Sequence, residues 1–133
     1  MWGRAIAIGG GGAALTGAAV WGFRAFDPVV VHALLVAGIG FIYVGFALAD
    51  GRVGVGVIES IVALVFFWLA AGALTIWAPL AGVALVLHGI WDLLHHPRAI
   101  TTKLPVWYPS MCAVYDWVLA AIFFVCWSRL GAT

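Results

Sequence analysis

A long charge-free stretch constrains the fold of this chain more than any other feature. Residues Val29 to Ala49 contain no Asp, Glu, Lys or Arg. As a helix, roughly 21 residues at about 1.5 Å each reach across a hydrocarbon core of about 30 Å. Comparable apolar stretches cover residues 5–23, 53–77, 79–96 and 110–127. We therefore predict an all-α fold, a polytopic membrane bundle of five transmembrane helices in a single domain spanning residues 1–133.

Composition supports a membrane location and excludes one class of partner. Hydrophobic residues make up 66% of the chain and charged residues 8%, whereas a soluble domain carries about 25% charged residues. The formal net charge is +1 and the chain has no basic run, which argues against binding to nucleic acid. The expected partner is the lipid bilayer, together with a substrate that is lipid-like or apolar.

The basic residues of the connections predict an orientation. One side of the membrane would carry Arg4, Arg52, Arg98 and Lys103, and the other Arg24 and Arg129. The positive-inside rule then places the amino terminus inside, in the cytoplasmic (inner) membrane. Before the second span, Asp27 is expected to cap a helix that Pro28 opens. In the first span, Gly10, Ala14, Ala18 and Gly22 recur every four residues, a stripe suited to close helix packing and compatible with a homo-oligomer or a subunit of a larger complex.

A polar segment lies at the end of the fourth apolar stretch. His88, Asp92, His95 and His96 fall within about 100° of one another on a helix. Ionisable groups inside a bilayer cost a few kcal/mol or more, so they turn inward and find partners. The segment therefore predicts an intramembrane site.

Counting depth along the helices indicates which other residues reach this site. With a rise of about 1.5 Å per residue, Glu59 and Asp116 lie about 9 Å from the inner edge, Asp92 about 6 Å and His88 about 12 Å. Tyr43 lies at a similar depth to Glu59. These residues are predicted to converge in one layer near the inner face, whereas His32 lies near the outer end of its span and out of reach.

The ligand types in this layer favour one zinc or iron ion. Asp92 and His95 form an i, i+3 carboxylate–histidine pair of the kind that helical metal sites use. His88 would add a nitrogen, and Glu59 and Asp116 would supply carboxylates from neighbouring helices. This mixed set suits zinc or iron better than magnesium or calcium. We predict His88, Asp92, His95 and Glu59 as metal ligands. Asp116, Tyr115 and His96 are the predicted catalytic residues, as general base or as groups that orient the ligands.

Several functions are compatible with this site. A metal-dependent enzyme would acidify a bound water for hydrolysis or, with iron, act as an oxidoreductase on a lipid or another apolar molecule. A metal-free isomerase could shuttle protons between Glu59, Asp92 and His88 while Trp91 stabilises a cation. A small proton or metal transporter or an assembly subunit is a further alternative, and the same groups could also form a purely structural ion-pair network.

Part of the chain resembles a family of small multi-spanning integral membrane proteins, a domain of unknown function. The resemblance rests on a His-x-x-Trp-Asp-x-x-His-His segment at residues 88–96, followed by Pro105, Cys112 and Asp116. It covers about residues 30–125, and the family carries an acidic residue in an earlier span that corresponds to Glu59. The resemblance implies a shared site and names no reaction.

Overall fold

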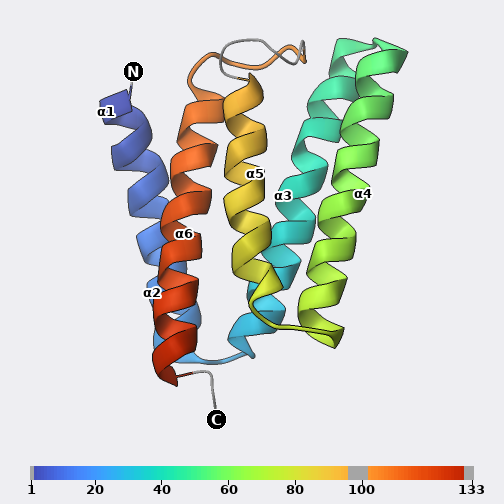
Figure 1. Cartoon of the computed structure of the whole chain (residues 1–133). Helices are drawn as coiled ribbons and strands as arrows, with labels where there is room; N and C mark the ends of the chain where they lie inside the picture. Colours follow the sequence, from blue (N-terminus) through green and yellow to red (C-terminus); the bar gives the residue numbers. More distant parts are fainter. Residues whose placement is uncertain (1, 96–101, 131–133) are drawn as a thin grey trace.

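The computed structural model describes residues 2–95 and 102–130, and these residues form helices and short connections without a strand. The first rod consists of α1 (Trp2–Ala5), η1 (Ile6–Gly10) and α2 (Gly11–Phe23). It is followed by α3 (Pro28–Asp50), α4 (Val53–Thr75), α5 (Leu80–His95) and α6 (Tyr108–Leu130). The five rods run up and down (Figure 1), so the predicted all-α fold is confirmed, and each rod ends within about three residues of a predicted span.

Four of the five rods are long and apolar enough to cross a membrane: Trp2–Phe23, Pro28–Asp50, Val53–Thr75 and Tyr108–Leu130. Helix α5 has 16 residues, which corresponds to about 24 Å of helix, less than a hydrocarbon core of about 30 Å. The described part of the chain therefore has four helices of membrane length and one shorter apolar helix. His96 lies outside the described residues.

The ends of α3 follow the local chemistry that the sequence indicates. The Asp27 carboxylate accepts hydrogen bonds from the backbone N–H groups of Val29 (2.7 Å) and Val30 (3.2 Å), with Pro28 in the first turn. This confirms the predicted amino-terminal cap. At the other end, Gly51 has a φ of 76°, a left-handed conformation that residues with a Cβ rarely adopt.

The amino-terminal rod packs through a different stripe from the one predicted. The buried residues are Ala5, Gly9, Ala13, Gly17 and Trp21, one position earlier than the Gly10 series. They face α6, where a Cβ on Gly9 would overlap the carbonyl oxygen of Met111. The prediction was wrong because a period of four fits both series and the sequence does not fix the rotation of the helix. The four consecutive glycines at Gly9–Gly12 do not break the rod. Instead, the rod widens into one π-helical turn at Ile6–Gly10.

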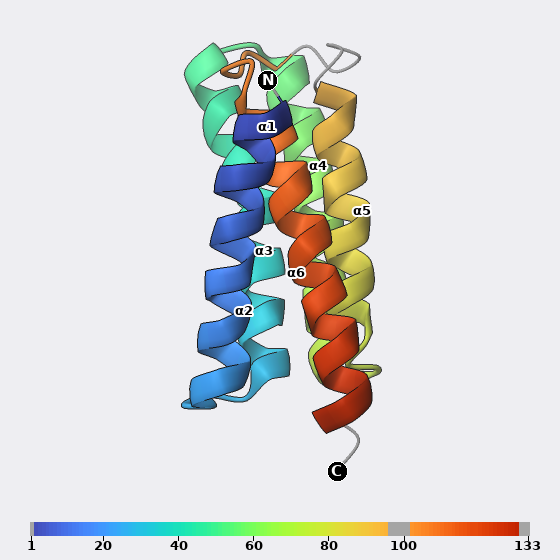
Figure 2. The same cartoon turned by 90° about the vertical axis from the view of Figure 1, so that its left-hand side faces the viewer.

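The other rods form two pairs, α3 with α4 and α5 with α6, and α5 also contacts α3 and α4. Figure 2 shows the amino-terminal rod alongside α6. The amino terminus, the α3–α4 turn and the connection before α6 lie at one end of the bundle (Figure 1). There Lys103 Nζ lies 3.1 Å from Asp50 Oδ1, so the connections grouped by sequence do share one end.

Candidate metal centre

Helix α5 places the candidate site because its buried face changes from apolar to polar along its length. The first half of that face consists of Ala81, Ala84 and Leu85, and the second half continues with His88, Asp92 and His95. Ala81, Leu85, His88, Asp92 and His95 follow one another at intervals of three or four residues, so they share the face that packs against the neighbouring helices. Next to His88, a Cβ on Gly89 would overlap the indole nitrogen of Trp117. Glycine at this position therefore allows α5 to approach α6 closely at the site.

The first polar group, which we call the His88 cluster, consists of His88, Asp92, Asp116 and Tyr43 from α5, α6 and α3. His88 Nδ1 lies 2.6 Å from Asp116 Oδ2 and 3.7 Å from Asp92 Oδ1. The Tyr43 hydroxyl donates to Asp92 Oδ1 at 2.5 Å. Each of the four residues is at most 3% exposed. These four residues, which the sequence predicted to lie in one layer, are therefore in contact with one another.

The hydrogen bonds of the His88 cluster leave two polar atoms unused. A carboxylate only accepts, so His88 Nδ1 carries the proton in the bond to Asp116. His88 Nε2 and Asp92 Oδ2 are buried, and neither has a hydrogen-bond partner among the described residues. The cluster also holds two carboxylates against one imidazole, while Arg52 and Lys103 pair with Asp50 at the end of the bundle. A buried excess of negative charge requires a proton or a cation.

The second polar group, the Glu59 pair, consists of Glu59 on α4 and His95 on α5. His95 Nε2 lies 2.9 Å from Glu59 Oε1, and His95 Nδ1 donates to the Trp91 carbonyl oxygen at 3.0 Å. Glu59 also accepts from the Thr102 hydroxyl at 2.5 Å and from the Trp91 indole N–H at 3.3 Å. The bonds from Thr102 and Trp91 favour an ionised carboxylate that also accepts from His95, so both nitrogens of His95 have hydrogen-bond partners.

Tyr43 joins the two groups. Its ring stacks on His95 with centroids 4.3 Å apart and planes 8° from parallel, while its hydroxyl donates to Asp92. The polar groups therefore form one continuous assembly in which a single aromatic ring separates the His88 cluster from the Glu59 pair. Thr102 belongs to the connection before α6, so this connection covers the Glu59 pair at the end of the bundle.

The His88 cluster has the composition of a metal site. His88, Asp92 and Asp116 each offer one ligand atom, and these atoms lie within 4.8 Å of one another. Bonds of about 2.0–2.2 Å to zinc place neighbouring ligands about 3–4 Å apart, so a small contraction would bring the three atoms into range. A divalent cation would also neutralise the two carboxylates. The residues therefore fit a transition metal in both chemistry and charge.

The predicted ligand set changes accordingly. His95 and Glu59, predicted as ligands, bond to each other, and in this arrangement neither nitrogen of His95 is free. Asp116, predicted as a catalytic residue, instead lies against His88. The structure brings Asp116 into the group because the close α5–α6 contact, which the sequence does not specify, turns its carboxylate toward α5.

Two other positions considered from the sequence, Tyr115 and His32, lie apart from the cluster. The Tyr115 hydroxyl is 3.0 Å from the Thr16 hydroxyl of α2, so Tyr115 faces the amino-terminal rod. His96 lies outside the described residues. His32 is buried beside Trp21 and Phe123, and its Nδ1 donates to the Pro28 carbonyl oxygen at 2.7 Å. As predicted, His32 takes no part in the cluster.

No signal in the sequence pointed to Thr102. It lies in a segment without helical periodicity, and only the structure shows that its hydroxyl donates to Glu59. Tyr43 could be found from its depth, but its two contacts depend on how α3 is rotated against α5.

Comparison with known proteins agrees with the resemblance seen in the sequence. No curated protein and no solved structure matches the chain. A family model does match, over residues 23–129, and this range includes every residue of the His88 cluster and of the Glu59 pair. The chain thus belongs to a family of unknown function, DUF6010.

Proposed function

We propose that this chain is an integral membrane protein with a metal site at the His88 cluster, and that it acts as a metal-dependent enzyme. The membrane assignment is supported by four helices of sufficient length and by many large apolar side chains on the outside of the bundle. Examples are Phe23 at 84% exposed, Ile76 at 82% and Trp68 at 70%. A soluble monomer rarely exposes such extensive apolar surface. The count of basic residues favours an inner membrane with the amino terminus inside.

The observation that carries the metal proposal is the buried group of one imidazole and two carboxylates with ligand atoms within 4.8 Å. In a low dielectric, this group needs a counter-charge, and a divalent ion supplies it. We assign His88, Asp92 and Asp116 as the ligands of one zinc or iron ion. Three protein ligands leave a position for water or substrate, as in catalytic zinc sites.

The reaction that suits this site is hydrolysis of a lipid or another apolar substrate, with oxidation as the counterpart if the ion is iron. The ion would supply a Lewis acid and a water of lowered pKa. Tyr43 holds Asp92 in place through its hydroxyl, and the Glu59 pair holds a proton one aromatic ring away. The cluster is closed in the described arrangement, so a substrate reaches it when the helices or the connection at 102–107 move apart.

The test is elemental analysis of protein purified without chelator. We expect about one zinc or iron ion per chain, and loss of that ion in His88→Ala. His32→Ala is the matched control, because His32 is also a buried histidine whose Nε2 has no partner, and it should keep the ion. A folded wild-type protein that binds neither zinc nor iron contradicts the proposal.

A second function is favoured by one specific observation, the buried run of hydrogen-bonded ionisable groups in the polar assembly. Tyr43 is bonded to Asp92, His88 to Asp116 and His95 to Glu59. A proton relay needs such exchangeable groups inside the bilayer and no metal. In vesicles loaded with a pH-sensitive dye, a relay predicts proton flux that persists in chelator and is lost in Glu59→Gln, whereas the metal enzyme predicts no flux.

A further inference from the structure

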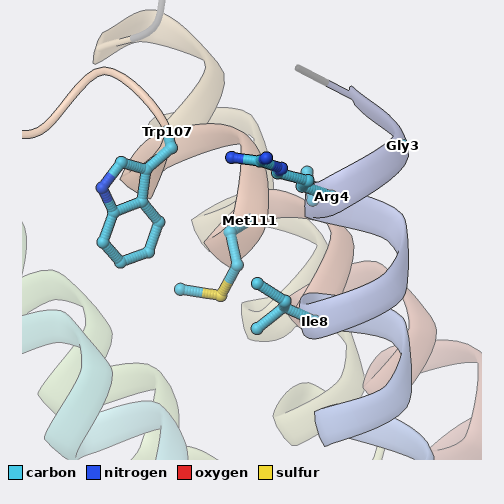
Figure 3. Close-up of a pocket in the computed structure, with 6 residues that line it drawn as sticks. Gly3, Arg4, Ile8, Trp107 and Met111 are labelled. Atoms are coloured by element: carbon cyan, nitrogen blue, oxygen red, sulfur yellow. The ribbon is translucent and has the colours of Figure 1, made fainter.

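A separate cavity lies between the start of the amino-terminal rod and the start of α6. It has a volume of about 690 Å³ and is lined by Gly3, Arg4, Ala5, Ile8, Trp107 and Met111. Figure 3 shows the Arg4 guanidinium reaching toward Trp107, with Met111 and Ile8 below it. The lining therefore combines one cationic side chain with a mainly apolar wall.

Within residues 2–95 and 102–130, Arg4 has no carboxylate partner. The protein contains five acidic residues, and each is engaged elsewhere. Asp27 caps α3, Asp50 pairs with Arg52 and Lys103, and the remaining three belong to the polar assembly. The exposed guanidinium of Arg4 is therefore available to an anion from outside the protein. Guanidinium groups bind phosphate in a bidentate geometry, which makes a phosphate ester the best-matched anion.

The apolar wall of the cavity limits which phosphate-containing molecules match its lining. Ile8 lies one turn below Arg4, about 6 Å along the rod, and Met111 faces it from α6. Met is a flexible side chain that adapts to irregular apolar partners, and Trp107 offers an indole of the kind that lies at the lipid headgroup level. A free phosphate would use only the guanidinium, whereas a phospholipid would use the guanidinium for its headgroup and the wall for its acyl chain.

We propose that this cavity binds the phosphate headgroup and the upper acyl chain of an anionic glycerophospholipid. The site is distinct from the metal centre. Met111 packs against η1 through its backbone, while Asp116 faces α5, so the two sites lie on different faces of α6. The proposal therefore stands independently of the metal.

The probe is phosphatidylglycerol, compared with phosphatidylcholine and with diacylglycerol, which lacks the phosphate. Binding to the full chain in detergent would be measured by native mass spectrometry. We expect phosphatidylglycerol to bind best, and Arg4→Gln to weaken its binding about tenfold or more, since charged hydrogen bonds contribute about 1.5–3 kcal/mol. Arg24→Gln is the matched control, because Arg24 is a surface arginine at the other end of the bundle, beside Trp21, and it should bind as the wild type does.

A second variant tests the cavity itself. Met111→Trp fills the apolar wall and should weaken phosphatidylglycerol binding while leaving the metal content unchanged. Equal loss in Arg4→Gln and Arg24→Gln would overturn the proposal, as would diacylglycerol binding as tightly as phosphatidylglycerol. Inorganic phosphate that competes at the same concentration as the lipid would also overturn it, because the acyl chain would then contribute nothing.

Discussion

The His88 cluster and the Glu59 pair are neighbours that both combine histidine with carboxylates. They differ in how completely the charges and hydrogen-bonding atoms within each group are paired. In the Glu59 pair, one histidine faces one carboxylate, and both ring nitrogens and both carboxylate oxygens have partners. In the His88 cluster, two carboxylates face one imidazole, and two buried atoms have no partner among the described residues.

From this difference we infer that the capacity to bind a metal depends on unused charge and unused lone pairs rather than on residue type. The Glu59 pair is balanced, so a metal could enter only by breaking hydrogen bonds. The His88 cluster carries excess negative charge, so a cation would stabilise it. The following substitutions test this difference by measuring stability and metal content when a partner is removed from either group.

The largest expected effect comes from breaking the balanced pair. His95→Ala leaves the Glu59 carboxylate buried without its histidine partner, and we expect the free energy of unfolding in detergent to fall by about 3–5 kcal/mol. The double variant Glu59→Gln/His95→Gln removes both ionisable groups and should recover much of that loss. Protein that remains folded should keep about one metal ion per chain. If His95→Ala lost the metal while keeping its stability, the metal would belong to the Glu59 pair and not to the His88 cluster.

A smaller effect is expected where the two groups meet. Tyr43→Phe keeps the ring that stacks on His95 and removes only the hydroxyl bond to Asp92. Loss of a group that orients a metal ligand typically lowers metal affinity about 10- to 100-fold, which a competitive titration with a chelator would measure. Tyr115→Phe is the matched control, because its hydroxyl contacts Thr16. Equal losses in both variants would count against a specific role for Tyr43.

The smallest expected effect lies at the edge of the Glu59 pair. Thr102→Val removes one of the three donors to Glu59 and should cost about 1 kcal/mol of the free energy of unfolding, with metal content unchanged. Thr75→Val serves as control, since Thr75 bonds only to the carbonyl oxygen of its own helix at Ala71. A Thr102→Val variant as stable as this control would show that the connection does not help hold the pair.

The sequence by itself determined the all-helical fold, the five helical segments and the height of the polar residues along them. These follow from charge-free length and from the fixed rise of a helix, which are properties of the chain alone. The same two properties sufficed to predict that Tyr43, His88, Asp92 and Asp116 lie in one layer and that His32 lies outside it.

Only the tertiary structure decided which of these residues face one another. Depth specifies height along a helix but not rotation about its axis, and rotation depends on how neighbouring surfaces pack. The close approach of α5 to α6 at Gly89 places His88 against Asp116. The contact between α5 and α4 places His95 within hydrogen-bonding distance of Glu59. The same limit explains why the packing stripe of the first rod was predicted one residue too late.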